Sequence, residues 1–376
     1  MKETDTRYTL NVVCRWVVGL VFIFSGFVKG VDPMGTTYKV QEYMTAWSVG
    51  GLTFEWALPL AGFLAGALIC AEFLVGVLLL TGAFRRLSAW MLALMMLFFT
   101  VTTLVDAVTN EVTDCGCFGD AVKLTNWQTF WKNIVLDVPT VWIFLTQKMR
   151  YTRRFERDVI IALAAVLAMV VFEVYNVQHE PVIDFRPWKV GNKMVEEHEA
   201  MNHMLLRDRQ TGKELTVDYL NGDWASVPEE YKDFDRWEVV ASTSDEPFEV
   251  KAAGFSMLDL ENEDHAVEML QNPDGLIIAT VHHIDEVDER GLREVRMAMQ
   301  LAEEAGCDMV LLTSALPEEV QSWLHAGGLD SLPYYFADDK AIETMMRGNP
   351  GLMYIKDGVV ISKGRKADRL KVKDEK

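Results

Sequence analysis

Long apolar stretches alternate with short polar segments through the first 178 residues. A helix needs about 20 mostly apolar residues to cross a bilayer. We therefore predict membrane-spanning helices at residues 10–29, 57–82, 87–109, 130–147 and 158–177. The first stretch carries Arg15 near its start and Lys29 at its end, and it lacks the short apolar core and small-residue cleavage site of a signal peptide. We interpret it as an uncleaved signal-anchor.

The pattern changes near Val177. The following residues are polar, aromatic and interrupted by proline, with alternating stretches such as "KELTVDYL", which predicts a small β-rich connector. After residue 248, signals for strands and helices alternate and end in a hairpin that turns at Asp357-Gly358. The strands are expected at 275–281 and 308–313, and the helices at 288–306, 317–328 and 338–348.

These signals divide the chain into four parts. We expect a four-helix transmembrane domain at 1–150, a fifth transmembrane helix at 151–179, the connector at 180–247 and an α/β domain at 248–376. The predicted fold class is an α-helical membrane bundle of about five transmembrane helices followed by an α/β domain outside the membrane.

Basic residues indicate how the spans are oriented. Phe84 to Arg86 joins the second and third spans, and Lys148 to Arg157 joins the fourth and fifth with five basic residues. By the positive-inside rule both segments are cytoplasmic. The amino terminus is then cytoplasmic and the chain after residue 178 lies outside, which in a bacterium predicts an inner-membrane protein with a periplasmic C-terminal domain. The alternative is that one apolar run is re-entrant or buried, which would reverse part of this topology.

Charge separates the two halves of the chain. Residues 1–178 carry 14 basic and 14 acidic side chains, whereas the remaining residues carry 22 and 41, so the net charge of −19 lies in the second half. Such an acidic surface lacks the basic footprint that nucleic-acid binding requires. The expected partners are the lipid bilayer and an envelope or periplasmic protein, and no nucleic acid.

The order of elements after residue 248 resembles the thioredoxin fold. In that family a redox motif follows the first central strand, and a proline, usually cis, precedes the final hairpin. Asn349-Pro350 occupies the position of that proline, whereas His282 to Asp285, "HHID", occupies the position of the redox motif. Thiol exchange requires a thiolate, which this motif lacks. We interpret His282 and His283 as a solvated loop pair and the domain as a thioredoxin-like docking module without its dithiol.

The stretch "TDCGCFGD" carries two of the five cysteines and lies in a predicted outer loop. One intervening residue lets Cys115 and Cys117 reach disulfide distance in a strained ring, and Gly116 relieves part of the strain. Strain makes a disulfide easy to reduce, which favours a redox pair. A structural staple gains little from so short a loop.

A metal site is the other alternative for this loop. Two thiolates with Asp114 and Asp120 offer ligands, but a structural zinc site normally takes four. The outer loops of the membrane half hold no second Cys/His pair, so His179 or His198 would have to reach in, and we do not predict a metal. A helix start at Thr125 or Asn126, together with Lys123, would favour a thiolate, and the two aspartates oppose this effect.

The first four spans resemble the DoxX-like membrane families, in particular the MauE family of methylamine utilisation. The resemblance covers about residues 8–148 and rests on "FIFSGFVKGVDPMG" (22–35), "AEFLVGVLLLTG" (71–82) and "CGCFGD" (115–120) before "NWQTFWKN". It implies Cys115 and Cys117 as the catalytic redox pair, with Glu72 and Lys29 in support at the membrane edge. Asp114 and Asp120, which flank the pair in the loop, are further supporting candidates. The resemblance also implies a link to periplasmic disulfide formation and to maturation of partner proteins.

The resemblance leaves two questions open. The shape of the family is similar to four-helix quinone-linked thiol oxidases, so quinone is a possible cofactor, although no residue here identifies a quinone site. Glu72 is a carboxyl inside a span, which is costly and indicates either a functional role or a structural pair with Lys29 or Arg15.

Two functional hypotheses follow. The first is an inner-membrane protein, a possible thiol–disulfide oxidoreductase, that supports periplasmic exchange or partner maturation through the Cys-Gly-Cys pair. The second is a non-catalytic scaffold or accessory subunit of an envelope complex, in which the thioredoxin-like domain docks a protein. The missing dithiol of that domain favours the second hypothesis, and the outer position of the Cys-Gly-Cys loop favours the first.

Overall fold

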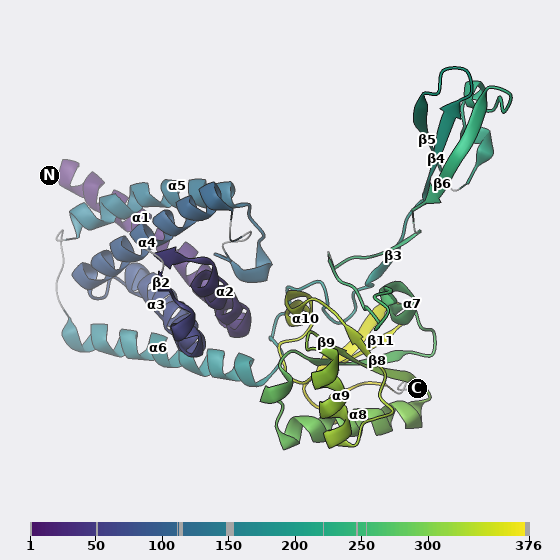
Figure 1. Ribbon diagram of the computed structural model, residues 1–376. Helices are drawn as coiled ribbons and strands as arrows, with labels where there is room; N and C mark the ends of the chain where they lie inside the picture. Colours follow the sequence, from purple (N-terminus) through teal and green to yellow (C-terminus); the bar gives the residue numbers. More distant parts are fainter. Residues whose placement is uncertain are drawn as a thin grey trace. The chain divides into compact units, whose positions relative to one another are not determined.

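The chain forms two compact units, residues 1–186 and 187–376. A computed structural model describes residues 2–49, 52–110, 112, 116–147, 154–220, 222–245, 247–252 and 254–372, without the side chains of residues 2–5, 48–49 and 52–53. The first unit is helical and the second is a mixture of strands and helices, as the hydropathy pattern predicts (Figure 1). Each unit is described separately below.

The helices of the first unit follow the predicted apolar stretches closely. α1 spans Lys2–Val31, α3 Ala61–Thr81, α4 Arg85–Thr109, α5 Asn126–Thr146 and α6 Phe155–Gln178; between α1 and α3 lie α2 (Pro33–Ala46), the short pair β1 (Ser48–Val49) and β2 (Leu52–Thr53), and the 3-10 helix η1 (Glu55–Leu60). α3 contacts α1, α4 and α6, and α5 packs against α4 and α1 (Figure 1). The predicted helix start before α5 is confirmed at Thr125, whose side chain accepts a hydrogen bond from the Gln128 amide.

Small residues allow α1 and α3 to pack closely. A Cβ added to Gly76 of α3 would lie 2.7 Å from Ile23 Cγ1 and 2.8 Å from the Gly19 carbonyl oxygen of α1. A Cβ added to Gly26 of α1 would lie 2.9 Å from the Phe73 amide nitrogen of α3. Helices in a membrane associate through this kind of backbone approach, because lipid supplies no hydrophobic driving force between them.

Substituting Gly76→Ala is expected to lower the stability of the first unit by about 1–3 kcal/mol, because the added methyl group forces the two backbones apart. Gly62→Ala is the matched control on the same helix, since its Cβ would meet nothing nearer than 3.9 Å. Unfolding of the detergent-solubilised protein by increasing SDS measures both effects. Equal effects of the two substitutions would contradict the packing argument.

The surface of the first unit identifies it as a membrane protein. Four helical stretches are long and apolar enough to cross a bilayer: Thr6–Val31, Glu55–Thr81, Arg85–Thr109 and Phe155–Gln178. Large apolar side chains are widely exposed on them, as expected for lipid contact. The predicted fourth span forms the 21-residue helix α5 but is not among these four, because Asn126, Lys132, Asn133 and Asp137 lower its hydropathy.

The second unit is built on a five-stranded sheet with the order β10-β9-β8-β11-β12. β8 (Leu276–Val281), β9 (Asp308–Thr313) and β10 (Tyr334–Phe336) are parallel, whereas β11 (Gly351–Lys356) and β12 (Val359–Gly364) form an antiparallel hairpin beside β8. The helices around the sheet are α7 (Ala266–Leu270), α8 (Glu289–Ala305), α9 (Pro317–Gly327) and α10 (Asp339–Met345), with 3-10 helices η5 (Ile284–Glu286) and η6 (Ala367–Arg369). The predicted strands, helices and Asp357-Gly358 turn are confirmed, with Asp357 and Gly358 both at positive φ.

Both faces of the five-stranded sheet are covered. Successive side chains of a strand point to opposite faces, and all six residues of β8 are buried, as expected of a central strand. Ile277, Ala279 and Val281 pack with α8 and α9, whereas Leu276 and Ile278 pack with α7 and α10. Trp188 and Met194 belong to the second of these cores, so the folded second unit includes residues well before the predicted domain start at 248.

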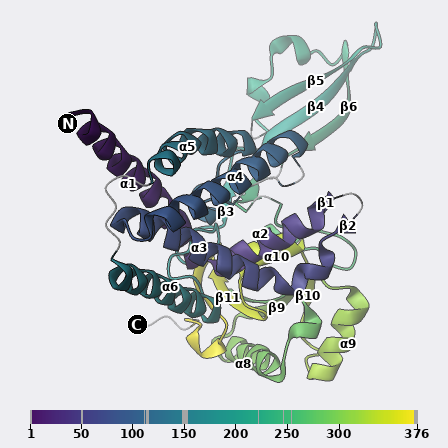
Figure 2. The ribbon, with the colours of Figure 1, turned by 90° about the vertical axis from the view of Figure 1, so that its left-hand side faces the viewer.

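A separate three-stranded antiparallel sheet is inserted into the second unit. β4 (Met201–Asp208) lies between β5 (Glu214–Leu220) and β6 (Trp237–Ser244), with 3-10 helices η3 (Trp224–Ser226) and η4 (Glu229–Tyr231) before β6 (Figure 2). β3 (Val195–Glu197) pairs with β7 (Phe248–Val250), so the two ends of the insertion lie side by side. A small core around Leu206, Val217 and Trp237 stabilises this sheet, which corresponds to the predicted β-rich connector.

Candidate functional site

A buried ion pair lies in the helical unit. Lys29 is in the last turn of α1, and Glu72 is near the middle of α3. The Lys29 Nζ lies 2.5 Å from Glu72 Oε1, and only 8% and 1% of these side chains are exposed. Of the two partners that the sequence allowed for Glu72, the structure thus selects Lys29, whereas Arg15 donates a hydrogen bond to the Leu79 carbonyl oxygen. The Glu72 charge is therefore compensated inside the bundle.

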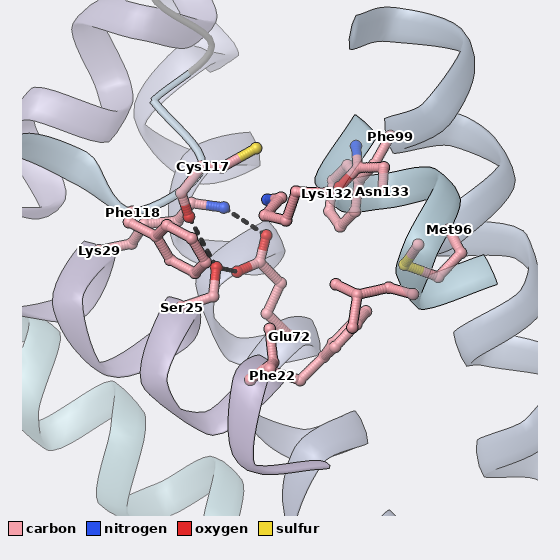
Figure 3. A pocket seen from close by; sticks show the side chains of 12 residues that line it. Phe22, Ser25, Lys29, Glu72, Met96, Phe99, Cys117, Phe118, Lys132 and Asn133 are labelled. Carbon is pink, nitrogen blue, oxygen red and sulfur yellow. Dashed lines mark hydrogen bonds and ion pairs between the residues drawn. The ribbon is translucent and has the colours of Figure 1, made fainter. Parts of the chain in front are cut away.

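Ser25 connects this ion pair to the Cys-Gly-Cys loop. Its hydroxyl oxygen lies 2.7 Å from Glu72 Oε2 and 2.8 Å from the Cys117 carbonyl oxygen (Figure 3). Ser25 precedes Lys29 by four residues, so both side chains lie on one face of α1. A serine hydroxyl has a single proton to donate, and here two acceptors compete for it. The loop backbone and the membrane-embedded carboxylate therefore share one hydrogen-bond donor.

A cavity of about 30 Å³ lies beside the ion pair. Its lining combines the polar side chains of Ser25, Lys29, Glu72, Lys132 and Asn133 with Cys117 and the apolar side chains of Val21, Phe22, Met96, Phe99, Phe118 and Leu136 (Figure 3). A space of this size beside polar side chains has room for a water molecule. Quinone stays a prediction from the resemblance.

Several contacts fix the loop over the bundle. Gly116 and Gly119 both have positive φ, which glycine adopts without strain, and the Gly119 amide donates a hydrogen bond of 3.0 Å to the Gly116 carbonyl oxygen. The Phe118 ring lies 5.5 Å from the Phe24 ring and 4.5 Å from Lys132 Nζ. Where the loop begins, the Asn126 side-chain amide donates a 2.8 Å hydrogen bond to the Val112 carbonyl oxygen.

The predicted site residues divide into three groups. The structure brings Lys29, Glu72 and Cys117 together around one cavity. Asp120 lies in the 3-10 helix η2 (Gly119–Ala121), outside the lining of that cavity. Cys115 and Asp114 lie outside the described residues.

Sequence reasoning missed Ser25, Lys132 and Asn133 as members of the site. The spacing of Ser25 to Lys29 was an available signal. No local signal predicts that Lys132 and Asn133 line the site, because this depends on which face of α5 packs against the other helices.

The histidine pair of the second unit corrects the prediction of a solvated loop. His282, the residue after β8, is only 5% exposed, whereas His283 is exposed. Among the described residues, neither ring nitrogen of His282 forms a hydrogen bond of normal geometry. The backbone of both histidines is held by Asn349, which accepts from the His282 amide and donates to the His283 carbonyl oxygen. The Asn349-Pro350 peptide bond is cis.

Burial also changes the titration of this region. Desolvation lowers the pKa of His282 to about 4, with the nearby Asp339 and the Met346 backbone opposing this change. Desolvation raises the pKa of Glu343 on α10 to about 7, and Asp339 adds to the increase. Both side chains are therefore mostly neutral between these two values. Desolvation at this edge of the sheet disfavours both the protonated form of His282 and the ionised form of Glu343.

The part of the chain that the structure describes contains one group of three potential metal ligands within 4.8 Å of one another. It consists of Asp259, Glu263 and His265. Its members are already engaged in a local turn. The His265 ring bonds to Asp259 Oδ2 at 3.0 Å, and Asp259 Oδ1 accepts from the Glu263 amide. These hydrogen bonds account for the cluster as a structural turn.

The comparison with known proteins finds a family match within the first unit. Residues 7–146 match the family described as methylamine utilisation protein MauE, a range that contains the whole site and ends with the last residue of α5. α6 and the second unit lie outside the match. No curated protein matches the chain, and no solved structure does. The resemblances to DoxX-like and thioredoxin-like proteins therefore stay predictions.

Proposed function

We propose that the protein supports thiol–disulfide exchange at the outer face of the membrane through Cys115 and Cys117. The observation that carries this proposal is the position of Cys117, in the lining of a cavity that it shares with a buried ion pair. A loop that is held by Ser25 and Phe118 keeps one thiol at a defined depth. A reactive cysteine needs such a defined position. A surface loop without a function does not need it.

The proposed reaction transfers a disulfide to a partner protein. A thiolate of the partner attacks one sulfur of the Cys115–Cys117 disulfide and forms a mixed disulfide, and the other cysteine leaves as a thiolate. The second thiol of the partner, after losing its proton, then attacks the mixed disulfide. The partner's two thiols are oxidised to a disulfide, and the two cysteines are reduced and take up the two protons.

The same proposal includes five spans and a cytoplasmic amino terminus. α5 supports this topology because it buries Asn126, Thr129, Asn133 and Thr140 and exposes Trp131, Val135, Val138 and Leu145. A helix in water shows the opposite arrangement, whereas a helix with lipid on its outer face buries its polar groups in the bundle. Four further helices meet the requirements of length and hydropathy. With the basic segments inside, the second unit lies in the periplasm.

We further infer that the second unit is thioredoxin-like and binds a protein. Support comes from the helix α8 that directly follows the central strand β8 and η5, and from the cis Asn349-Pro350 bond before the β11–β12 hairpin. The site that would hold a dithiol contains His282 and His283. An accessory scaffold without redox chemistry is the second candidate, and the absence of cysteine at this position is the observation that favours it.

Substituting either Cys115→Ser or Cys117→Ser is expected to reduce the oxidation of a dithiol peptide at least 100-fold, because each thiol is needed to form or resolve the mixed disulfide. The measurement is a single turnover of the oxidised, full-length protein in membrane vesicles, with the peptide product quantified by mass spectrometry. Cys14→Ser, a cysteine within α1, is the control that should retain the wild-type rate. Unchanged rates in both loop variants, or cysteines that remain reduced under oxidising conditions, would leave the scaffold as the function.

A further inference from the structure

Lys132 lies beside Cys117 without taking part in the buried ion pair. It is half-buried in the second turn of α5 and lines the same cavity as Cys117 (Figure 3). Its Nζ lies 4.5 Å from the centre of the Phe118 ring, the residue after Cys117. A cation over an aromatic ring is favourable and is more so away from water. This contact holds the ammonium group beside the Cys-Gly-Cys loop.

The other cations around Cys117 are already paired with carboxylates. Lys29 on α1 is paired with Glu72 on α3. Lys39 on α2, which lies along Gly116, is paired with Glu42 at 2.7 Å. α4 contributes only Met96 and Phe99 to the lining, and Asp120 follows in the loop itself.

Among the described residues, Lys132 forms no ion pair. The lining of the cavity thus has one positive charge more than its negative charges. A negative charge that forms on Cys117, in the same lining, would be compensated by Lys132.

We infer that Lys132 stabilises the thiolate of Cys117 and thereby makes Cys117 the leaving group of the exchange reaction. This inference rests on the proposed function. The attacking thiolate of the partner bonds to the Cys115 sulfur, the bond between the two cysteine sulfurs breaks, and its electron pair stays on Cys117. A nearby cation makes a thiol a better leaving group. Lys132 is in this sense a positioning residue, since it acts through Cys117.

The test measures the thiolate of Cys117 directly. The full-length protein in detergent is reduced and then alkylated with iodoacetamide at pH values from 5 to 10, and the peptide that contains Cys117 is quantified by mass spectrometry. Lys132→Met is expected to alkylate about tenfold more slowly at pH 7, as a shift of one pH unit in the rate profile would produce. Lys132→Arg keeps the charge and should stay within about twofold of the wild type.

Lys123→Met is the comparison, because the sequence offered Lys123 as a second cation that would favour the thiolate, whereas in the structure it is exposed and outside the lining of the cavity. The inference is overturned if Lys132→Met leaves the rate profile unchanged, or if Lys123→Met or Lys132→Arg shifts it as much. Thermal unfolding of each variant shows whether the bundle is intact, and a local packing defect would affect the Met and Arg variants alike. If the profile shifts while the dithiol peptide is not oxidised, the proposed function fails and the inference about the thiolate stands.

Discussion

Lys29→Met is expected to destabilise the helical unit by about 3–5 kcal/mol, because it leaves the Glu72 carboxylate uncompensated inside the bundle. The Glu72 side chain is 1% exposed, so it cannot turn to water. The remaining hydrogen bond from Ser25 does not replace the lost charge. SDS-induced unfolding of the detergent-solubilised protein measures the loss.

The double substitution Lys29→Met with Glu72→Met should recover most of this stability, because apolar replacement of a buried pair costs little when the volume is kept. The pair of Lys39 and Glu42 provides the matched comparison. It is also an ion pair of α-helical residues, but its side chains are 24% and 18% exposed, so Lys39→Met should cost less than about 1 kcal/mol. A double variant as unstable as Lys29→Met would show that the site needs the charges and not only their cancellation.

The second unit is expected to show two opposite pH dependences that partly cancel. The pKa of His282 is lowered from 6.5 to about 4 in the folded state. As the pH falls, His282 therefore takes up a proton in the unfolded chain before it does so in the folded chain. The contribution of His282 to stability is present above pH 6.5 and is lost as the pH falls towards 4. The shift corresponds to about 3 kcal/mol.

Glu343 acts in the other direction. Its pKa is raised from 4.5 to about 7, so its contribution is present below pH 4.5 and is lost as the pH rises towards 7. The side chain is partly exposed, which makes its effect smaller than that of His282. Neither residue is a cause of the pKa shift of the other, so single substitutions should separate the two effects.

His282→Leu is therefore expected to leave a unit that gains stability as the pH falls from 7 to 4.5, whereas Glu343→Gln should leave one that loses stability over the same range. Pulse proteolysis in urea with an acid-tolerant protease, scored on peptides from β8 and β9, reports the unfolding of this unit within the full-length protein. Parallel pH profiles for the two variants would show that these groups titrate with ordinary pKa values. His198→Gln changes an exposed histidine just after β3 and is the control.

Strong local patterns made much of the fold predictable. The apolar stretches determine the helices, because an apolar stretch of that length has few alternatives to a spanning helix. The run from Leu276 to Val281 identified the central strand, and Asp357-Gly358 identified the hairpin, because two residues at positive φ strongly favour this pair. α5 was harder, since its polar residues lower the mean hydropathy and their burial depends on the neighbouring helices.

The site was predictable only in part. A carboxyl within an apolar helix requires a partner, so a cation near Glu72 could be expected, but the choice between Lys29 and Arg15 depends on the register of α1 against α3. Ser25 and Cys117 are separated by 92 positions in the chain, and no local pattern relates them. The burial of His282 was missed for a similar reason. Two adjacent histidines after a strand look solvated, and α10 covers only one of the directions in which they point.

The single proton of Ser25 makes the membrane interior and the outer loop thermodynamically linked. Donation to the Cys117 carbonyl oxygen weakens the bond to Glu72, and donation to Glu72 releases the loop backbone. A docked partner protein that displaces the loop would therefore free the Ser25 hydroxyl for Glu72. By reciprocity, a change at the Glu72 end of this shared bond changes how firmly the loop backbone is held.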